Sequence, residues 1–227
     1  MTICIRPKRV GIILAVLVVC VTLAYALGQF LKHHMGFDNA WGLGPQFDLD
    51  GEANLSTWYA SSTLFLAAVL LGVITCLKKA AKDSFTLHWA GLCALFVFMS
   101  ASETARIHEQ WPAVVATSTY VVVPGVPIAL FFVVVYLRFL LHLPAPCRYL
   151  FCSSGFLFTL GAAGMEMVEQ LLTRIPGSGE VVLSFTVGIE ESLEMVGVAL
   201  FIYSLFFYLK TEFGTVQVKF QDTATPP

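Results

Sequence analysis

Six long apolar stretches recur along the chain, separated by short polar segments. They cover residues 10–31, 62–77, 86–102, 120–143, 149–172 and 181–209. A helix needs about 20 mostly apolar residues to cross the hydrocarbon core of a bilayer, and tryptophan and tyrosine favour its edges. Trp58 stands before the second stretch, Trp89 lies in the third and Tyr149 opens the fifth. The pattern predicts an all-α membrane protein, a bundle of six transmembrane helices forming one integral membrane domain over residues 1–227.

The composition supports this class. Of the 227 residues, 57% are hydrophobic and 12% are charged, against about 25% charged in an average soluble chain. The mean hydropathy of +0.79 leaves no room for a separate soluble domain. A net charge of -2 argues against a basic surface for nucleic acid. The lipid bilayer is therefore the one partner that the composition identifies, and nothing in the sequence names a protein partner.

Basic residues predict the orientation of the bundle. With alternating crossings from a cytoplasmic N-terminus, ten of the 13 basic residues lie inside, as the positive-inside rule requires. These are Arg6, Lys8, Arg9, Lys78, Lys79, Lys82, Arg138, Arg148, Lys210 and Lys219. We therefore expect both termini to be cytoplasmic.

The first stretch has an alternative interpretation as a cleaved secretory signal. Arg6, Lys8 and Arg9 precede an apolar core, and residues 24–26 read Ala-Tyr-Ala, as at a cleavage site. The apolar run continues to Leu31, which favours a retained membrane anchor.

Carboxylates occur within the third, fifth and sixth stretches, where apolar residues are expected. Glu103, Glu166, Glu190 and Glu194 all fall in the outer half of the bilayer, and Glu190 and Glu194 lie about 40° apart on one helical face. A carboxylate at mid-bilayer depth costs at least ~2.5 kcal/mol. Protonation, pairing with an arginine or a bound cation can offset this cost. The spacing therefore predicts one inward-facing acidic site.

The residue types suggest which cation would bind. Carboxylates with one imidazole suit iron, manganese or zinc, whereas carboxylates alone suit calcium. The sequence predicts a divalent metal ion as cofactor, without choosing among iron, zinc, manganese and calcium. The candidate ligands are Glu103, His108, Glu166, Glu190 and Glu194, with Glu109, Glu169 and Glu191 as secondary candidates.

The outer loop, residues 32–57, adds a second acidic motif. Asp48, Asp50, Glu52 and Asn54 alternate just before Trp58. The alternation resembles the start of a calcium-binding EF-hand loop, although the glycine spacing differs and the distal glutamate is missing. One interpretation is a cation site or a lid over the helical carboxylates. The other is a solvated turn in which Asn54 or Ser56 caps the following helix.

These motifs resemble a family of uncharacterised bacterial multi-pass membrane proteins. The resemblance rests on the FDxDxExN loop at 47–54, the segment running from Glu103 to His108-Glu109, and EExLEMxG at 190–197. In that family an aspartate precedes the first glutamate, where this chain has Ser102, so one potential ligand is missing. The resemblance supports the sites and implies a location in the cytoplasmic (inner) membrane of a bacterium. It implies no particular activity.

A more distant likeness is to the alkaline ceramidases. These membrane hydrolases have an outer acidic calcium loop and a zinc site within the bundle. Their zinc rests on several histidines, including a pair on one helix, where this chain has Glu190 and Glu194.

Three classes of function fit these observations. The first is a cation-binding membrane protein, whose enzymatic form would act on a lipid-like substrate through its metal. The second is a transport module in which the glutamates exchange protons or ions. The third is an accessory subunit whose polar cluster ties helices together, with Gly155, Gly161 and Gly164 as close-packing positions. The sequence does not decide whether the protein is an enzyme.

Overall fold

The computed structural model describes residues 5–37, 39, 42–51, 53–105, 107, 133–175 and 179–214, and within these residues all regular secondary structure is helical. The elements in chain order are α1 (Pro7–Met35), α2 (Leu43–Gln46), α3 (Leu55–Ala80), α4 (Thr86–Ala105), an unlabelled helix (Val133–His142), α7 (Ala145–Thr159), the π-helical segment η2 (Leu160–Met165), α8 (Glu166–Leu172) and α9 (Glu180–Phe213). The last three elements before α9 run on as one rod, Ala145–Leu172.

Four of these helices are long and apolar enough to cross a membrane: α1, α3, the rod Ala145–Leu172 and α9. They match the first, second, fifth and sixth predicted spans. The helix α4 occupies the place of the third span with 20 residues. Most of the fourth predicted span, residues 120–132, lies outside the described residues, and its end is the short helix Val133–His142. The structure therefore supports a helical membrane protein with four clear spans.

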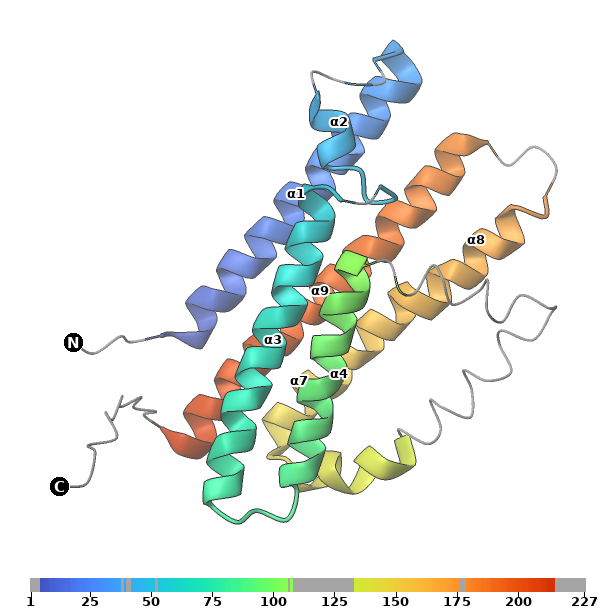
Figure 1. The fold of residues 1–227 in the computed structure, drawn as a ribbon. Coiled ribbons are helices and arrows are strands. Elements are labelled where there is room, and N and C mark those ends of the chain that lie inside the picture. Colours follow the sequence, from blue (N-terminus) through green and yellow to red (C-terminus); the bar gives the residue numbers. More distant parts are fainter. Residues whose placement is uncertain are drawn as a thin grey trace.

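The long helix α9 lies at the centre of the arrangement. It packs against α1 on one side, and α7, η2 and α3 also contact it. The helices α3 and α4 form an antiparallel hairpin, which has the most extensive helix–helix packing among the described residues (Figure 1). The helix α4 ends near the middle of α9 (Figure 1), and Gly161, just before α8, contacts α9 at Glu190 and Glu194. Carboxylates on α4, α8 and α9 can therefore meet at one level.

Capping residues set helix ends that lie beyond the predicted apolar stretches. The first helix ends at Gly36, whose left-handed φ of 68° suits glycine. The side chain of Asn54 accepts a hydrogen bond from the backbone N–H of Thr57, so α3 begins at Leu55, seven residues before the predicted apolar stretch. Hydropathy detects the apolar interior of a helix, whereas capping determines where the helix starts.

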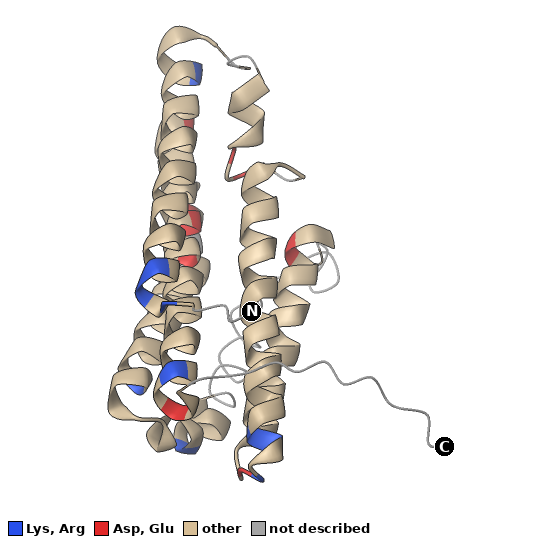
Figure 2. Cartoon of the chain, turned by 90° about the vertical axis from the view of Figure 1, so that its left-hand side faces the viewer, with Lys and Arg blue, Asp and Glu red and all other residues tan. Residues whose placement is uncertain are grey.

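One end of the bundle is tied by aromatic packing and an ion pair. Trp89 is 1% exposed, and its ring lies 4.9 Å from that of Phe139 and 4.8 Å from that of Tyr208. Beside Tyr208, the buried Lys78 ammonium contacts Asp83 at 3.1 Å and Glu212 at 2.9 Å. Most lysines and arginines lie in this half of the bundle, and most of the acidic residues lie in the other half (Figure 2).

Candidate functional site

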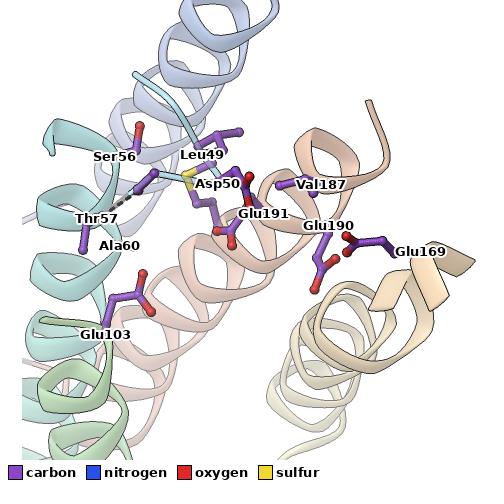
Figure 3. A pocket seen from close by; sticks show the side chains of 12 residues that line it. Leu49, Asp50, Ser56, Thr57, Ala60, Glu103, Glu169, Val187, Glu190 and Glu191 are labelled. Carbon is purple, nitrogen blue, oxygen red and sulfur yellow. Dashed lines mark hydrogen bonds between the residues drawn. The ribbon is translucent and has the colours of Figure 1, made fainter. Parts of the chain in front are cut away.

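A cavity of about 180 Å³ lies at the acidic end of the bundle, between α3, α4, α8 and α9. Five carboxylates line it: Asp50, Glu103, Glu169, Glu190 and Glu191. They come from four segments that are far apart in the chain, and Figure 3 shows Glu103 and Glu169 reaching toward the space from opposite sides. The floor includes the buried side chain of Met195. The volume is sufficient for an ion together with several water molecules.

The position of Glu103 depends on polar contacts between α3 and α4. The Ser100 hydroxyl donates to the Ser61 carbonyl at 2.9 Å. The Ser61 hydroxyl lies 2.9 Å from the Ser100 carbonyl and 2.8 Å from the Thr104 hydroxyl. These contacts bind the end of α4 to α3 on either side of Glu103. Sequence reasoning missed this role, and the signal for it was the run of small hydroxyl residues before Glu103.

The fifth span changes its helical period next to the site. Within η2 the backbone is π-helical, a rare form that often occurs at functional sites. Its Gly161 lies directly against α9, since a Cβ there would be 2.8 Å from the Glu190 carbonyl oxygen and 2.9 Å from Cγ of Glu194. Only glycine fits this contact without displacement. The close approach sets the positions of α8 and α9, and with them those of Glu169 and Glu190.

The outer loop forms part of the cavity wall through Leu49, Asp50 and Gly51. The Asn54 amide nitrogen donates to the carbonyls of Asp48 at 2.7 Å and Gly51 at 2.9 Å, while its oxygen caps α3. Asn54 is 8% exposed and is committed to these contacts. These hydrogen bonds hold Asn54 against the backbone of Asp48 and Gly51, and Asp50, which lies between them, lines the cavity. The capping interpretation of Asn54 therefore describes the loop.

The site concentrates negative charge in a space partly shielded from water. Carboxylates this close repel one another, which favours shared protons or a bound cation. The first turn of α3, including Ser56 and Thr57, also lines the cavity. The unpaired N–H groups and positive dipole end of a helix stabilise nearby negative charge. This helix end supplies part of the compensation that the carboxylates need.

The structure arranges the predicted ligands unequally. Glu103 and Glu190 line the cavity together with the secondary candidates Glu169 and Glu191. Glu194 instead contacts the η2 segment at Gly161. His108, Glu109, Glu52 and the side chain of Glu166 lie outside the described residues. Within the described part of the chain, no three His, Cys, Asp or Glu side chains form a group that could hold a metal ion.

The fold and this site define an integral membrane protein with an acidic cavity within its helical bundle. Residues 11–209 match the family described as Domain of unknown function (DUF8692), and the chain belongs to this family. No curated protein and no solved structure matches the chain.

Proposed function

We propose that the acidic cavity binds a cation, and that a divalent metal ion is its principal occupant. The observation behind this proposal is that carboxylates from four separate segments line a single cavity. Carboxylates at this depth are costly unless they are neutralised, so their convergence is best explained by a cation that they bind together. Oxygen ligands favour calcium or manganese, and an added imidazole from His108 would extend the choice to iron and zinc.

The described carboxylates surround the cavity without converging on one point. Binding would therefore draw Glu103 and Glu190 inward, with water completing the coordination of a partly hydrated ion. Glu169 and Glu191 would balance the remaining charge. Glu166 and Glu194 remain in the proposed site because they lie at the same height in the bundle as the carboxylates that line the cavity.

We also propose that the cavity lies on the outer side of a bacterial cytoplasmic membrane. The support is the clustering of basic residues at the opposite end of the bundle (Figure 2), which the positive-inside rule places in the cytoplasm. An enzymatic form of this function would use the metal as a Lewis acid or to activate water against a lipid-like substrate.

The apolar layer below the cavity favours a binding site over a conduction path. Met195, Val198 and Ile202 of α9 are buried beneath it, with Leu71 of α3 against them in the same core. This layer separates the cavity from the Lys78 cluster in the described structure. A proton- or ion-coupled transport module remains the alternative function, and a purely structural polar cluster is the third.

Metal analysis of the native protein, purified in mild detergent, tests the proposal. We expect close to one equivalent of a divalent metal ion, or binding of added Mn²⁺ or Ca²⁺ to protein stripped with chelator. Glu103→Gln and the pair Glu190→Gln with Glu194→Gln should lower affinity while leaving membrane insertion intact. Glu180→Gln is the matched control, because Glu180 is exposed in the first turn of α9 and outside the cavity.

The proposal fails if the purified and the reconstituted protein both retain no divalent ion. It also fails if Glu180→Gln lowers affinity as much as Glu190→Gln with Glu194→Gln, because the effect would then not depend on the cavity. Loss of folding in the glutamine variants with unchanged metal content would instead indicate a structural polar cluster.

A further inference from the structure

A second hollow lies on the other side of α9, in the groove between α1 and α9. Its volume is about 330 Å³, nearly twice that of the acidic cavity. On α9 it extends from Ser184 to Val196, which corresponds to roughly 18 Å along the helix axis. Both walls are helices long enough to cross a membrane. The groove is therefore an elongated slot that follows the direction of a lipid chain.

The surface of the groove is apolar although several of its residues carry hydroxyl groups. The Thr22 and Ser192 hydroxyls are 2.9 Å apart, and Ser192 also donates to the Gly188 carbonyl at 2.6 Å. Phe185 and Ile189 form the open rim and are 57% and 51% exposed. With the hydroxyls bonded to one another and to backbone, the groove offers its contents hydrocarbon contacts.

Tyr25 separates this groove from the acidic side of the molecule. Its ring lies against Gly188, where an added Cβ would be 2.6 Å from the ring, and its hydroxyl donates to the Ser184 carbonyl at 2.7 Å. The carboxylates of Asp48, Asp50 and Glu191 are near enough to interact electrostatically with this hydroxyl. Carboxylates therefore lie near Tyr25, which lines the apolar groove.

Two buried acceptor atoms lie near Tyr25, one on Gln29, which lines the groove, and one on Asp48. Among the described residues, no donor reaches Oε1 of Gln29, one turn above Tyr25, or Oδ1 of Asp48. Buried acceptors without donors are costly. A ligand that brings N–H donors and a positive charge would satisfy both atoms.

We propose that the groove between α1 and α9 binds the hydrocarbon chain of an amphiphile whose head group carries a protonated amine, with the amine held near Asp48 and Asp50. The hydrocarbon chain would occupy the apolar groove. The ammonium would contact the nearby carboxylates and donate hydrogen bonds to the buried acceptor atoms of Gln29 and Asp48. The ligand class that follows for this membrane protein is a lipid whose head group carries a protonated amine. The position of the head group rests on the proposed function of the acidic side, whereas the chain site rests on the groove alone.

Photolabelling of the full chain in phosphatidylcholine vesicles tests this inference. The probes are a long-chain alkylamine with a diazirine in its chain and the otherwise identical alcohol. We expect the amine to label peptides of α1 and α9 about fivefold more than the alcohol, the fold-change produced by one screened charge interaction of about 1 kcal/mol. Equal labelling by the two probes, or labelling spread evenly over all spans, would overturn the proposal.

Variants separate the chain site from the head-group site. Ala26 lines the groove, so Ala26→Phe should fill it and lower labelling by the amine about fivefold. Val19 lies on α1 outside the groove and is 55% exposed, so Val19→Phe should leave labelling unchanged. Asp48→Asn with Asp50→Asn should abolish the preference for amine over alcohol and leave alcohol labelling intact. Unchanged labelling in Ala26→Phe, or a preference that survives loss of both aspartates, would contradict the inference.

Mn²⁺ binding measured on the same samples distinguishes this inference from the proposed function. If the chain binds no divalent ion but retains the amine preference, the amphiphile site stands and the metal proposal fails. If Mn²⁺ binds and the two probes label equally, the metal proposal stands and the amphiphile site is overturned.

Discussion

Substitution of Gly161 by alanine tests how the site is held together. An added Cβ would lie 2.8 Å from the Glu190 carbonyl oxygen and 3.2 Å from the Glu194 nitrogen, both backbone atoms that cannot rotate away. Ordinary contact begins near 3.4 Å, so η2 and α9 must separate by about 0.6 Å, an overpacking that costs about 1–3 kcal/mol. Alanine recovers up to about 1 kcal/mol of helix propensity. We therefore expect a net loss of about 0–2 kcal/mol in stability.

The larger effect should fall on cation binding. The separation displaces Glu190 on α9 relative to Glu169, which follows η2 on the same rod. Changes in residues that orient metal ligands typically cost 10- to 100-fold in affinity. We expect Gly161→Ala to weaken Mn²⁺ binding about tenfold, measured by titration of the purified protein.

Two other glycines serve as matched controls. A Cβ at Gly155, on the same rod, would meet nothing within 4 Å, so Gly155→Ala should preserve both stability and affinity. A Cβ at Gly197 would lie 2.8 Å from the Phe158 nitrogen. Because that contact is equally tight but lies away from the cavity lining, Gly197→Ala should lower stability to a similar degree without weakening Mn²⁺ binding. Equal loss of affinity in Gly161→Ala and Gly197→Ala would refute a positioning role for Gly161.

Three further predictions concern the rest of the fold. Lys78→Met removes the ammonium that Asp83 and Glu212 share. Because Lys78 is buried while Glu212 is 37% exposed, we expect the free energy of unfolding to fall by about 2–3 kcal/mol, between the surface and buried limits for ion pairs. Detergent unfolding followed by circular dichroism measures this loss, and a value below about 0.5 kcal/mol would contradict the prediction. Burial opposes ionisation of Asp83, but the Phe85 N–H at 2.7 Å and the Lys78 ammonium lower its pKa below the ordinary 3.8. The resulting stabilisation is complete above the ordinary pKa and is lost as pH falls through the lowered pKa. Wild-type protein should therefore lose stability on acidification below about pH 4, and Asp83→Asn should lack that part of the decline. Asn54→Ala removes the α3 cap and the loop hydrogen bonds, so the free energy of unfolding should fall by about 1–2 kcal/mol with faster proteolysis of the loop, and an unchanged loop would show that the contacts are not needed.

Much of the fold was predictable because a bilayer imposes a simple pattern. Apolar runs of spanning length locate α1, α3, the rod Ala145–Leu172 and α9 in the sequence. Their ends were harder to predict, since Asn54 starts α3 well before the apolar run and Lys78 lies within its last turn, paired with carboxylates from other segments. Polar residues that are capped or paired extend a helix beyond the part that hydropathy detects.

The membership of the acidic cavity was predictable only in part. Glu103 and Glu190 were expected to face inward and do line the cavity, but Glu191 lines it beside Glu190 while Glu194 contacts Gly161. The rotation of α9 about its axis decides this choice, and that rotation is set by close contacts with Gly161 and Tyr25. Counting at 100° per residue also fails across η2, because a π-helical turn contains more residues than an α-helical one. Regular spacing could therefore indicate which helices contribute carboxylates, but not which glutamate each helix presents.

The two ends of the bundle divide stability from binding. At the Lys78 end, the rings of Trp89, Phe139 and Tyr208 pack closely beside an ion pair, and this packing stabilises the association of the helices. The acidic end instead retains a cavity, repelling carboxylates and a groove open at its rim. Because repulsion among the carboxylates opposes folding, the pair Glu190→Gln with Glu194→Gln should unfold at the same or a higher temperature than wild-type protein in the absence of metal. Added Mn²⁺ should raise the unfolding temperature of the wild type and not that of the variant, since a ligand stabilises only the state that binds it.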